Sequence, residues 1–470
     1  MTGPFIKIKN TTTRMMINVI VALIPIILFS FYKNGVIPYT KGYISIFEMF
    51  YPLIFILIGT LSTFIFETIY LVIVGKGKRK LKEVISNSYA FMPGLFLSLV
   101  LPFNTPIIIL IFGAFVSSII AKMLFGGFGQ NIFNPALIGC LFVITAYSSL
   151  ILINGGYMNL YERDTISGAT PLSNVKSLDG IGSYETAVEP YGGISDFFIG
   201  TIPGSLGETS ALLCIIAFIY LALTKTIKWR IPVLYISTVF IMSLFIGLYN
   251  GESLWYPLFM LFSGGLMFGA IFMATDPVTS PVTKPAQIVF GICLGILTVI
   301  LRHLTTFPEG VLTSILTMNM FVVILDKFGV KAKLDNKKVI IPLVVLIILI
   351  FGFSFVIGNK YKYGNTETSG FKILNIETEG DNVIYTASQK GNDGPITLLI
   401  TISNGNIVSA EVISQNESFF NIIEDADYIN KLINSPSIYE VDTVSGATIS
   451  SSALKKLFIN VLDDYNGGHK

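Results

Sequence analysis

The chain has little charge and few residues that bind metals. Only 13% of its 470 residues are charged, whereas 52% are hydrophobic, and the mean hydropathy is +0.71. Soluble globular proteins have about a quarter of their residues charged, so lipid is the expected main solvent and a cytosolic enzyme is excluded. The net charge of +2 offers no basic field to a phosphate backbone, so we expect no nucleic-acid partner.

Cysteine and histidine are too scarce for a metal or haem centre. Cys140, Cys214 and Cys293 stand singly in apolar stretches, which excludes a disulfide framework or an iron–sulfur site within this chain and favours buried thiols. The two histidines are His303 and His469, and the second is next to last, so two axial haem ligands inside a membrane are lacking. No Walker A loop and no Gly-x-Gly-x-x-Gly after a strand occur, so no nucleotide site is evident.

Long apolar runs predict a polytopic α-helical membrane protein. A helix needs roughly 17 to 25 apolar residues to cross a bilayer. Eleven runs approach this length, about ten forming a bundle and the last an anchor span: 15–32, 48–75, 88–101, 105–124, 134–152, 209–226, 230–248, 255–274, 284–301, 308–326 and 338–357. The first follows basic residues and lacks a small-residue cleavage site, so it is expected to be retained.

Lysine and arginine concentrate at the amino terminus and in every second loop between these runs. Cytoplasmic loops are the ones enriched in basic residues, so the amino terminus is predicted to be cytoplasmic. The loop at 153–208 and everything after the eleventh run then lie on the outer face.

The last 113 residues predict a small soluble α+β domain. Segments 371–377, 383–388, 395–402 and 406–413 alternate apolar with polar residues between turn clusters, which is typical of strands. Residues 450–463 fit an amphipathic helix with Leu454, Leu457, Phe458 and Val461 on one face, and Ser450 is suited to cap it. The predicted domains are 1–330 (membrane domain), 331–357 (linker and anchor span) and 358–470 (soluble domain).

One heptapeptide occurs twice. Asp164-Thr-Ile-Ser167-Gly168-Ala169-Thr170 lies in the outer loop, and Asp442-Thr-Val-Ser445-Gly446-Ala447-Thr448 lies in the tail. Six of the seven positions are identical in otherwise dissimilar contexts. Helix capping alone would explain one or two Ser, Gly or Thr residues, but it does not explain a shared aspartate six positions ahead of a shared threonine.

The repeated heptapeptide resembles a flavin attachment motif. Asp-x-x-Ser-Gly-Ala-Thr is similar to the motif through which FMN is covalently bound, by its phosphate, to the last threonine in membrane subunits of Rnf-type complexes and of Na⁺-translocating NADH:quinone reductases. The resemblance implies that Thr170 and Thr448 carry FMN as phosphoesters. It makes the Asp, Ser, Gly and Ala positions of the motif recognition residues for a separate flavin transferase, namely Asp164, Ser167, Gly168, Ala169, Asp442, Ser445, Gly446 and Ala447.

The resemblance extends over most of the chain. Residues 1 to about 330 resemble the D subunit of the Rnf complex, the counterpart of the B subunit of the sodium-pumping reductase, on the stretches 126–136, 203–209 and 274–281. From about 338 the chain is similar to the FMN-binding G subunit or to a generic FMN-binding domain. Ser414-Gln-Asn-Glu-Ser418 stands where a His-x-Glu-Thr-Pro-Gly stretch is typical, so the tail either replaces a G subunit or adds a flavin beside one.

Three further positions have two interpretations each. The segment Gly126–Ala136 is either a structural connection or, by family resemblance, a site for noncovalent riboflavin with Asn131 and Asn134 as amide partners. Asp276 belongs either to a family motif or to a capped turn. Glu67, within an apolar run, either serves cation coupling or sits at the cytoplasmic interface.

The function that the resemblance implies is electron relay in an ion-translocating ferredoxin:NAD⁺ oxidoreductase of a bacterial inner membrane. The expected partners are other Rnf-type membrane and iron–sulfur subunits, the flavin transferase, membrane lipid, and Na⁺ or H⁺. The threonines would be tethers and not acid–base catalysts. Two alternatives remain: a component of a Na⁺-translocating NADH:quinone reductase, and a non-redox secondary transporter with an outer sensor domain.

Overall fold

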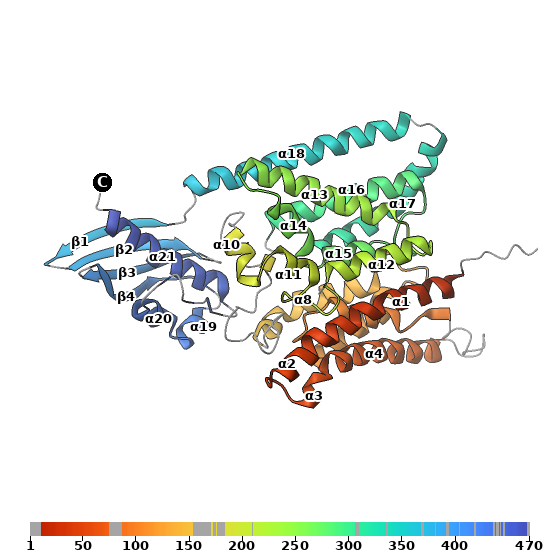
Figure 1. Cartoon of the computed structure of the whole chain (residues 1–470), viewed down its shortest axis with the longest axis horizontal. Helices are drawn as coiled ribbons and strands as arrows, with labels where there is room; N and C mark the ends of the chain where they lie inside the picture. The colour runs from red at the N-terminus through yellow and green to blue at the C-terminus, as the bar shows by residue number, and fades with distance from the viewer. Residues whose placement is uncertain are drawn as a thin grey trace, which may run out of the picture. The chain divides into compact units, whose positions relative to one another are not determined.

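The computed structural model forms two compact units (Figure 1). The boundary towards the carboxyl end falls between Gly358 and Asn359, inside helix α18 (Lys337–Glu367), most of which belongs to the first unit. It describes these residues: 11–74, 87–153, 171–172, 175, 184–208, 210–305, 310–334, 337–367, 371–380, 382–391, 394–403, 405–417, 420–435, 438, 441, 443–444 and 447–467. The first unit is helical, and the second contains a four-stranded sheet with helices.

The long helices of the first unit run roughly parallel to one another (Figure 1). Its elements are α1 (Thr12–Phe31), η1 (Tyr32–Val36), α2 (Ile37–Thr40), α3 (Ile46–Met49), α4 (Tyr51–Val74), α6 (Met92–Val100), α7 (Ile107–Phe115), η2 (Val116–Met123), α8 (Pro135–Ile153), α10 (Tyr184–Ala187), η3 (Glu189–Tyr191), α11 (Ile194–Ile199), α12 (Ala211–Leu223), α13 (Arg230–Tyr249), α14 (Trp255–Phe262), α15 (Leu266–Phe268), η4 (Gly269–Met273), α16 (Lys284–Leu304), α17 (Val311–Leu334) and α18 (Lys337–Glu367).

The expected count of eleven spans is not confirmed. Within the described residues, six helices are long and apolar enough to cross a membrane, or seven if α14 and the α15–η4 segment, bent by 65°, form one span. Apolar helices stand in the other expected ranges, but they are shorter. Helix α6 has nine residues, which at 1.5 Å per residue is about 14 Å, half of a hydrocarbon core of about 30 Å.

At the helix breaks in this unit, backbone carbonyls accept hydrogen bonds from distant segments of the chain. The carbonyl of Leu99, near the end of α6, accepts a hydrogen bond from the Gly207 amide at 2.7 Å. At the α14–α15 bend the buried Arg302 guanidinium donates to the carbonyls of Met260 and Ser263, at 2.5 and 3.1 Å. Lipid cannot hydrate such carbonyls, so these contacts make broken helices tolerable here.

Glycines let several helices pack at backbone distance. A methyl group added at Gly94 of α6 would overlap the Gly59 carbonyl and the Thr63 hydroxyl of α4. Gly139 of α8 similarly faces the Gly113 carbonyl of α7 at 2.7 Å from an added Cβ. Small residues commonly allow such close approach in membranes, where dispersion contacts drive helix association.

Helix α18 continues the first unit beyond the residues that resemble the membrane subunit. Phe351 and Phe355 pack edge-on against Phe245 and Tyr249 of α13, with centroid distances of 4.8 and 5.6 Å. The Asn250 amide donates to the Gly358 carbonyl at 3.3 Å. The anchor helix therefore contacts the end of α13 through the part of α18 from Phe351 to Gly358.

The second unit contains the predicted strands and the predicted last helix. Strands β1 (Lys372–Glu379), β2 (Asn382–Lys390), β3 (Pro395–Ser403) and β4 (Asn406–Ser414) form an antiparallel sheet in chain order. Helix α21 (Thr448–Gly467) packs on one face, and α19 (Phe420–Asp425) and α20 (Tyr428–Asn434), which the sequence did not predict, complete the fold. These helices were missed because each is only six or seven residues long.

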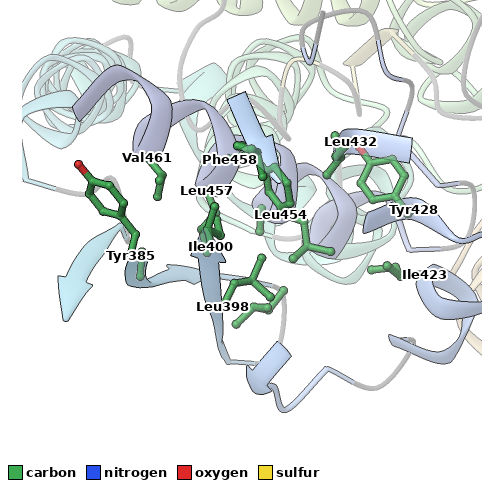
Figure 2. Close-up of a cluster of buried hydrophobic side chains, with 14 of the residues drawn as sticks. Tyr385, Leu398, Ile400, Ile423, Tyr428, Leu432, Leu454, Leu457, Phe458 and Val461 are labelled. Atoms are coloured by element: carbon green, nitrogen blue, oxygen red, sulfur yellow. The ribbon is translucent and has the colours of Figure 1, made fainter. Parts of the chain in front are cut away.

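The core of the second unit joins the sheet to α21 (Figure 2). Leu398 and Ile400 from β3 are fully buried against the predicted apolar face of α21, whose four side chains are all fully buried: Leu454, Leu457, Phe458 and Val461. The Tyr385 hydroxyl reaches Asp464 at 3.1 Å, and burial raises the pKa of Tyr385 to about 12, so it stays protonated and donates.

We predict that Gly94→Ala destabilises the first unit because its methyl group must displace backbone of α4. The expected loss is on the order of 1–3 kcal/mol, seen as a lower unfolding temperature of detergent-solubilised protein. Gly352→Ala in α18 is the matched control, since an added methyl group meets nothing within 4 Å there. Equal thermal stability of the two variants would contradict the proposed close packing.

Candidate functional site

Two irregular segments of the first unit each follow a π-helical turn. Residues 124–134 follow η2 and lead to α8, which begins at Pro135. Residues 274–283 follow η4 and lead to α16, which has proline in its first turn. Proline suits a first helical turn because its missing N–H needs no partner there. π-Helical turns are rare and frequently occur at functional sites.

Buried polar side chains hold the two segments together. Asn319 of α17 is buried, and its side-chain amide is taken in the orientation that satisfies both its oxygen and its nitrogen. The side-chain oxygen then accepts from the backbone N–H of Asn134 at 3.1 Å, and the side-chain nitrogen donates to the backbone carbonyl of Thr279 at 3.1 Å. The Asp276 carboxylate accepts from the backbone and side chain of Thr279, at 3.0 and 2.9 Å. Asp276 therefore does cap a turn, as one of its two interpretations predicted.

The two segments line one pocket together with α1, α6 and α12. Its lining is mainly apolar and aromatic and comprises Met15, Met16, Val19, Tyr89, Met92, Pro93, Phe96, Lys122, Phe128, Asn131, Asn134, Pro135, Ala136, Leu221, Thr226, Ile227, Ile271, Phe272, Thr275, Asp276, Pro277 and Val278. The segment 126–136 thus contributes to a cavity as well as connecting two helices.

Asn131 and Asn134 both line this pocket, but their side chains differ in availability. The Asn134 oxygen accepts from the amides of Ala136 and Leu137, at 3.1 and 3.4 Å, and so caps α8. Its nitrogen lies 3.6 Å from the Met273 sulfur. The Asn131 nitrogen donates to the Phe133 carbonyl at 3.0 Å, and its oxygen accepts nothing from the described residues. Asn131 therefore has an open acceptor beside the pocket.

Glu67 forms a buried ion pair with Lys122 at the pocket. Their side chains are 0% and 2% exposed, and the lysine nitrogen lies 3.0 and 2.9 Å from the two carboxylate oxygens. The same nitrogen donates to the Ser88 carbonyl at 2.7 Å, and the Ser88 hydroxyl donates to Glu67. Glu67 is thus neither unpaired nor exposed, because a charge removed from water needs an opposite charge and hydrogen bonds.

The attachment heptapeptides lie mostly outside the described residues. That holds for Asp164, Ser167, Gly168, Ala169 and Thr170, and for Asp442, Ser445 and Gly446. In the second copy, Ala447 is buried in the core of the tail, and Thr448 is the first residue of α21.

The start of α21 is tied to the sheet by a buried carboxylate. The Glu417 side chain accepts from Ser450 of α21 and from the Gly394 amide before β3, the latter at 3.0 Å. The prediction that Ser450 caps this helix is wrong, because the helix begins two residues earlier and the hydroxyl is bound to Glu417. The Val444 amide, within the heptapeptide, donates to the Ser451 hydroxyl at 3.0 Å.

Sequence reasoning did not single out Lys122 and Asn319. Lys122 stands near the end of the predicted span 105–124, and it lies inside η2 and is buried. Asn319 stands within the apolar run of α17. Both carry the signal that identified Glu67, a polar residue inside an apolar run. No disulfide joins the three cysteines, all of which lie in the described residues; Cys140 and Cys214 are buried and Cys293 is half-buried.

The fold and the pocket define a class: helical membrane proteins with a largely apolar pocket and a separate small α+β domain. Residues 1–335 match the model of the NQR2, RnfD, RnfE family, and residues 391–463 match that of the FMN-binding domain. The chain therefore belongs to the NQR2, RnfD, RnfE family and carries an FMN-binding domain at its carboxyl end.

Individual relatives agree with this membership. The chain is 33% identical to the D subunit of the proton-translocating ferredoxin:NAD(+) oxidoreductase complex of Clostridium ljungdahlii, over 72% of this chain and 96% of that protein. It is 32% identical to the D subunit of the Na(+)-translocating complex of Acetobacterium woodii, over 69% and 92%. The B subunit of the Na(+)-translocating NADH-quinone reductase of Chromohalobacter salexigens is 33% identical over 53% and 60%.

We predict that Asn319→Leu destabilises the junction of the two irregular segments. The substitution leaves the Asn134 amide and the Thr279 carbonyl buried without their partner, at a cost of about 1–3 kcal/mol. The measurement is the unfolding temperature in detergent, compared with Met320→Leu on the exposed side of α17. If both variants unfold at the wild-type temperature, Asn319 does not hold the segments together.

Proposed function

We propose that this chain is the D-type membrane flavoprotein subunit of an ion-translocating ferredoxin:NAD⁺ oxidoreductase complex. The observation that carries the proposal is the match to D subunits of such complexes over nearly their whole length. The quinone-reductase alternative is less favoured, because those relatives are covered over only about 60% of their length. The non-redox transporter alternative leaves the FMN-binding domain unexplained.

The two heptapeptide threonines are the proposed attachment points of covalent FMN. The repeat itself supports this assignment, since the second copy lies within 391–463, the region that matches the FMN-binding domain. Thr448 also begins a helix of 20 residues, so a phosphoester there would lie at the positive end of the helix dipole. When bound, FMN supplies one- and two-electron redox chemistry, while the two threonines act only as tethers.

We predict that in-gel flavin fluorescence after full denaturation depends on these threonines. Protein made with a flavin transferase should lose part of its fluorescence in Thr170→Val and in Thr448→Val, and all of it in the double variant. Valine removes the hydroxyl that is esterified but keeps the side-chain shape. Thr443→Val, in the same second copy, is the matched control and should retain full fluorescence. Fluorescence persisting in the double variant would place the tether elsewhere.

The pocket of the first unit is the proposed site of a noncovalent riboflavin. Its aromatic lining suits a planar ring system, and the open Asn131 oxygen suits a ring N–H as partner. Lys122 and Asp276 are the charged lining residues in the described part of the chain, and Lys122 is committed to Glu67 and Ser88. Without an available cation the pocket disfavours a phosphate, so riboflavin fits it better than FMN.

We predict that protein lacking both covalent flavins binds riboflavin at least about tenfold more tightly than FMN, since a phosphate would be buried without a counter-charge. Quenching of flavin fluorescence during titration of the Thr170→Val/Thr448→Val protein measures both dissociation constants. Asn131→Leu should weaken riboflavin binding through its lost acceptor. Equal affinity for the two flavins would contradict the assignment of this pocket.

The proposed setting of the chain is a bacterial inner membrane with the amino terminus in the cytoplasm. The distribution of basic loops supports this orientation, which puts both attachment threonines on the outer face. Ferredoxin-side electrons would reach the chain from iron–sulfur partner subunits, since its own sequence offers no cluster ligands and no nucleotide loop. Translocation of Na⁺ or H⁺ is a property of the assembled complex.

A further inference from the structure

A strained backbone position lies in the wall of the pocket. Tyr89 has a φ of +50°, in the left-handed region that a bulky side chain rarely adopts. Such a conformation persists only where neighbouring contacts over-determine it, and it recurs at active sites, ligand clamps and switch regions. The groups that hold Tyr89 therefore bear on how the pocket works.

The residue before Tyr89 is clamped by the buried ion pair. Ser88 donates its hydroxyl to Glu67 and accepts from Lys122 through its carbonyl, the latter at 2.7 Å. At its other end Tyr89 is held by α1, because its hydroxyl is hydrogen-bonded to the Thr13 hydroxyl at 2.9 Å. All three N–H groups of Lys122 are thereby used, two on Glu67 and one on Ser88.

The strained position presents an aromatic ring to the pocket. Tyr89 and Phe128, here called the aromatic wall, have ring centroids 5.0 Å apart and an interplanar angle of 60°. The Lys122 nitrogen lies 5.9 Å from the Phe128 centroid, close enough for a cation–π interaction. One lysine therefore contacts the backbone that orients the first ring and the face of the second.

We propose that Glu67 and Lys122 are positioning residues for the ring system of the noncovalent flavin. Their ion pair holds Ser88, which keeps Tyr89 in its left-handed conformation and orients the aromatic wall on which the flavin ring packs. The inference rests on the proposed flavin pocket and deepens it. The charged Glu67 side chain then serves ligand binding and not cation transport, since both of its carboxylate oxygens already accept hydrogen bonds from Lys122 or Ser88.

A double-mutant cycle on full-length Thr170→Val/Thr448→Val protein in detergent tests this. Riboflavin is titrated, and its dissociation constant and its fluorescence when bound are measured. Tyr89→Leu removes a ring contact and should weaken binding about tenfold. Glu67→Gln should weaken it to a similar degree, and the combined variant should bind no more weakly than Tyr89→Leu alone, because Glu67 acts through Tyr89.

The fluorescence of bound riboflavin distinguishes a positioning role of Glu67 from a purely structural one, which would leave this fluorescence unchanged. A tyrosine ring packed on a flavin quenches its emission, so the bound signal should rise in Tyr89→Leu and also in Glu67→Gln. Glu67→Leu/Lys122→Met replaces the ion pair by apolar groups, which commonly preserves folding. This variant takes the place of Glu67→Gln in the cycle if Glu67→Gln does not fold. Ser354→Ala, at a buried position of α18, is the control and should leave binding unchanged.

Three results would overturn the inference. Additive effects of Tyr89→Leu and Glu67→Gln would mean that Glu67 does not act through the aromatic wall. A lower unfolding temperature with an unchanged dissociation constant would make the ion pair structural only. If the parent Thr170→Val/Thr448→Val protein binds no riboflavin at all, the proposed pocket itself is refuted, and the inference fails with it for that separate reason.

Discussion

Breaking a helix inside a membrane leaves amides and carbonyls that lipid cannot hydrate, and this constraint governs the first unit of the protein. Each break described above is accompanied by a buried polar group from elsewhere in the chain. Arg302 donates to the carbonyls at the α14–α15 bend, and Asn319 joins the two irregular segments. Because an unsatisfied polar group in hydrocarbon costs several kcal/mol, these side chains determine where irregular backbone can exist.

The pocket is a consequence of that irregular backbone. Regular helices packed through glycines, as α4 and α6 are at Gly59 and Gly94, leave no room for a ligand. Two segments that depart from helical geometry after π turns open a space between themselves and α1. The buried pair of Glu67 and Lys122 lies at the same place, so the charge, the strain at Tyr89 and the cavity form one arrangement.

The two proposed kinds of flavin site follow different physical rules. A pocket lined by aromatic rings selects a planar uncharged ligand by shape and burial, and it needs a rigid scaffold around it. A covalent tether needs only an accessible hydroxyl in a sequence that a transferase recognises. This difference explains why the pocket is built from segments distant in sequence, whereas the attachment motif is contained in seven consecutive residues that occur in two unrelated contexts.

Hydropathy, strand alternation and short motifs are local properties, so the amino-acid order was enough to predict the helical membrane class, the small α+β tail and the family. The strands at 372–414 and the buried face of α21 were confirmed for that reason. Three features emerged only from the folded chain: α6 is about half as long as a hydrocarbon core is thick, Glu67 pairs with a residue 55 positions away, and Asn134 caps a helix while Asn131 keeps an open acceptor. Ion pairs, caps and cavities depend on which segments meet in space, and a linear pattern of residue types does not encode that meeting directly.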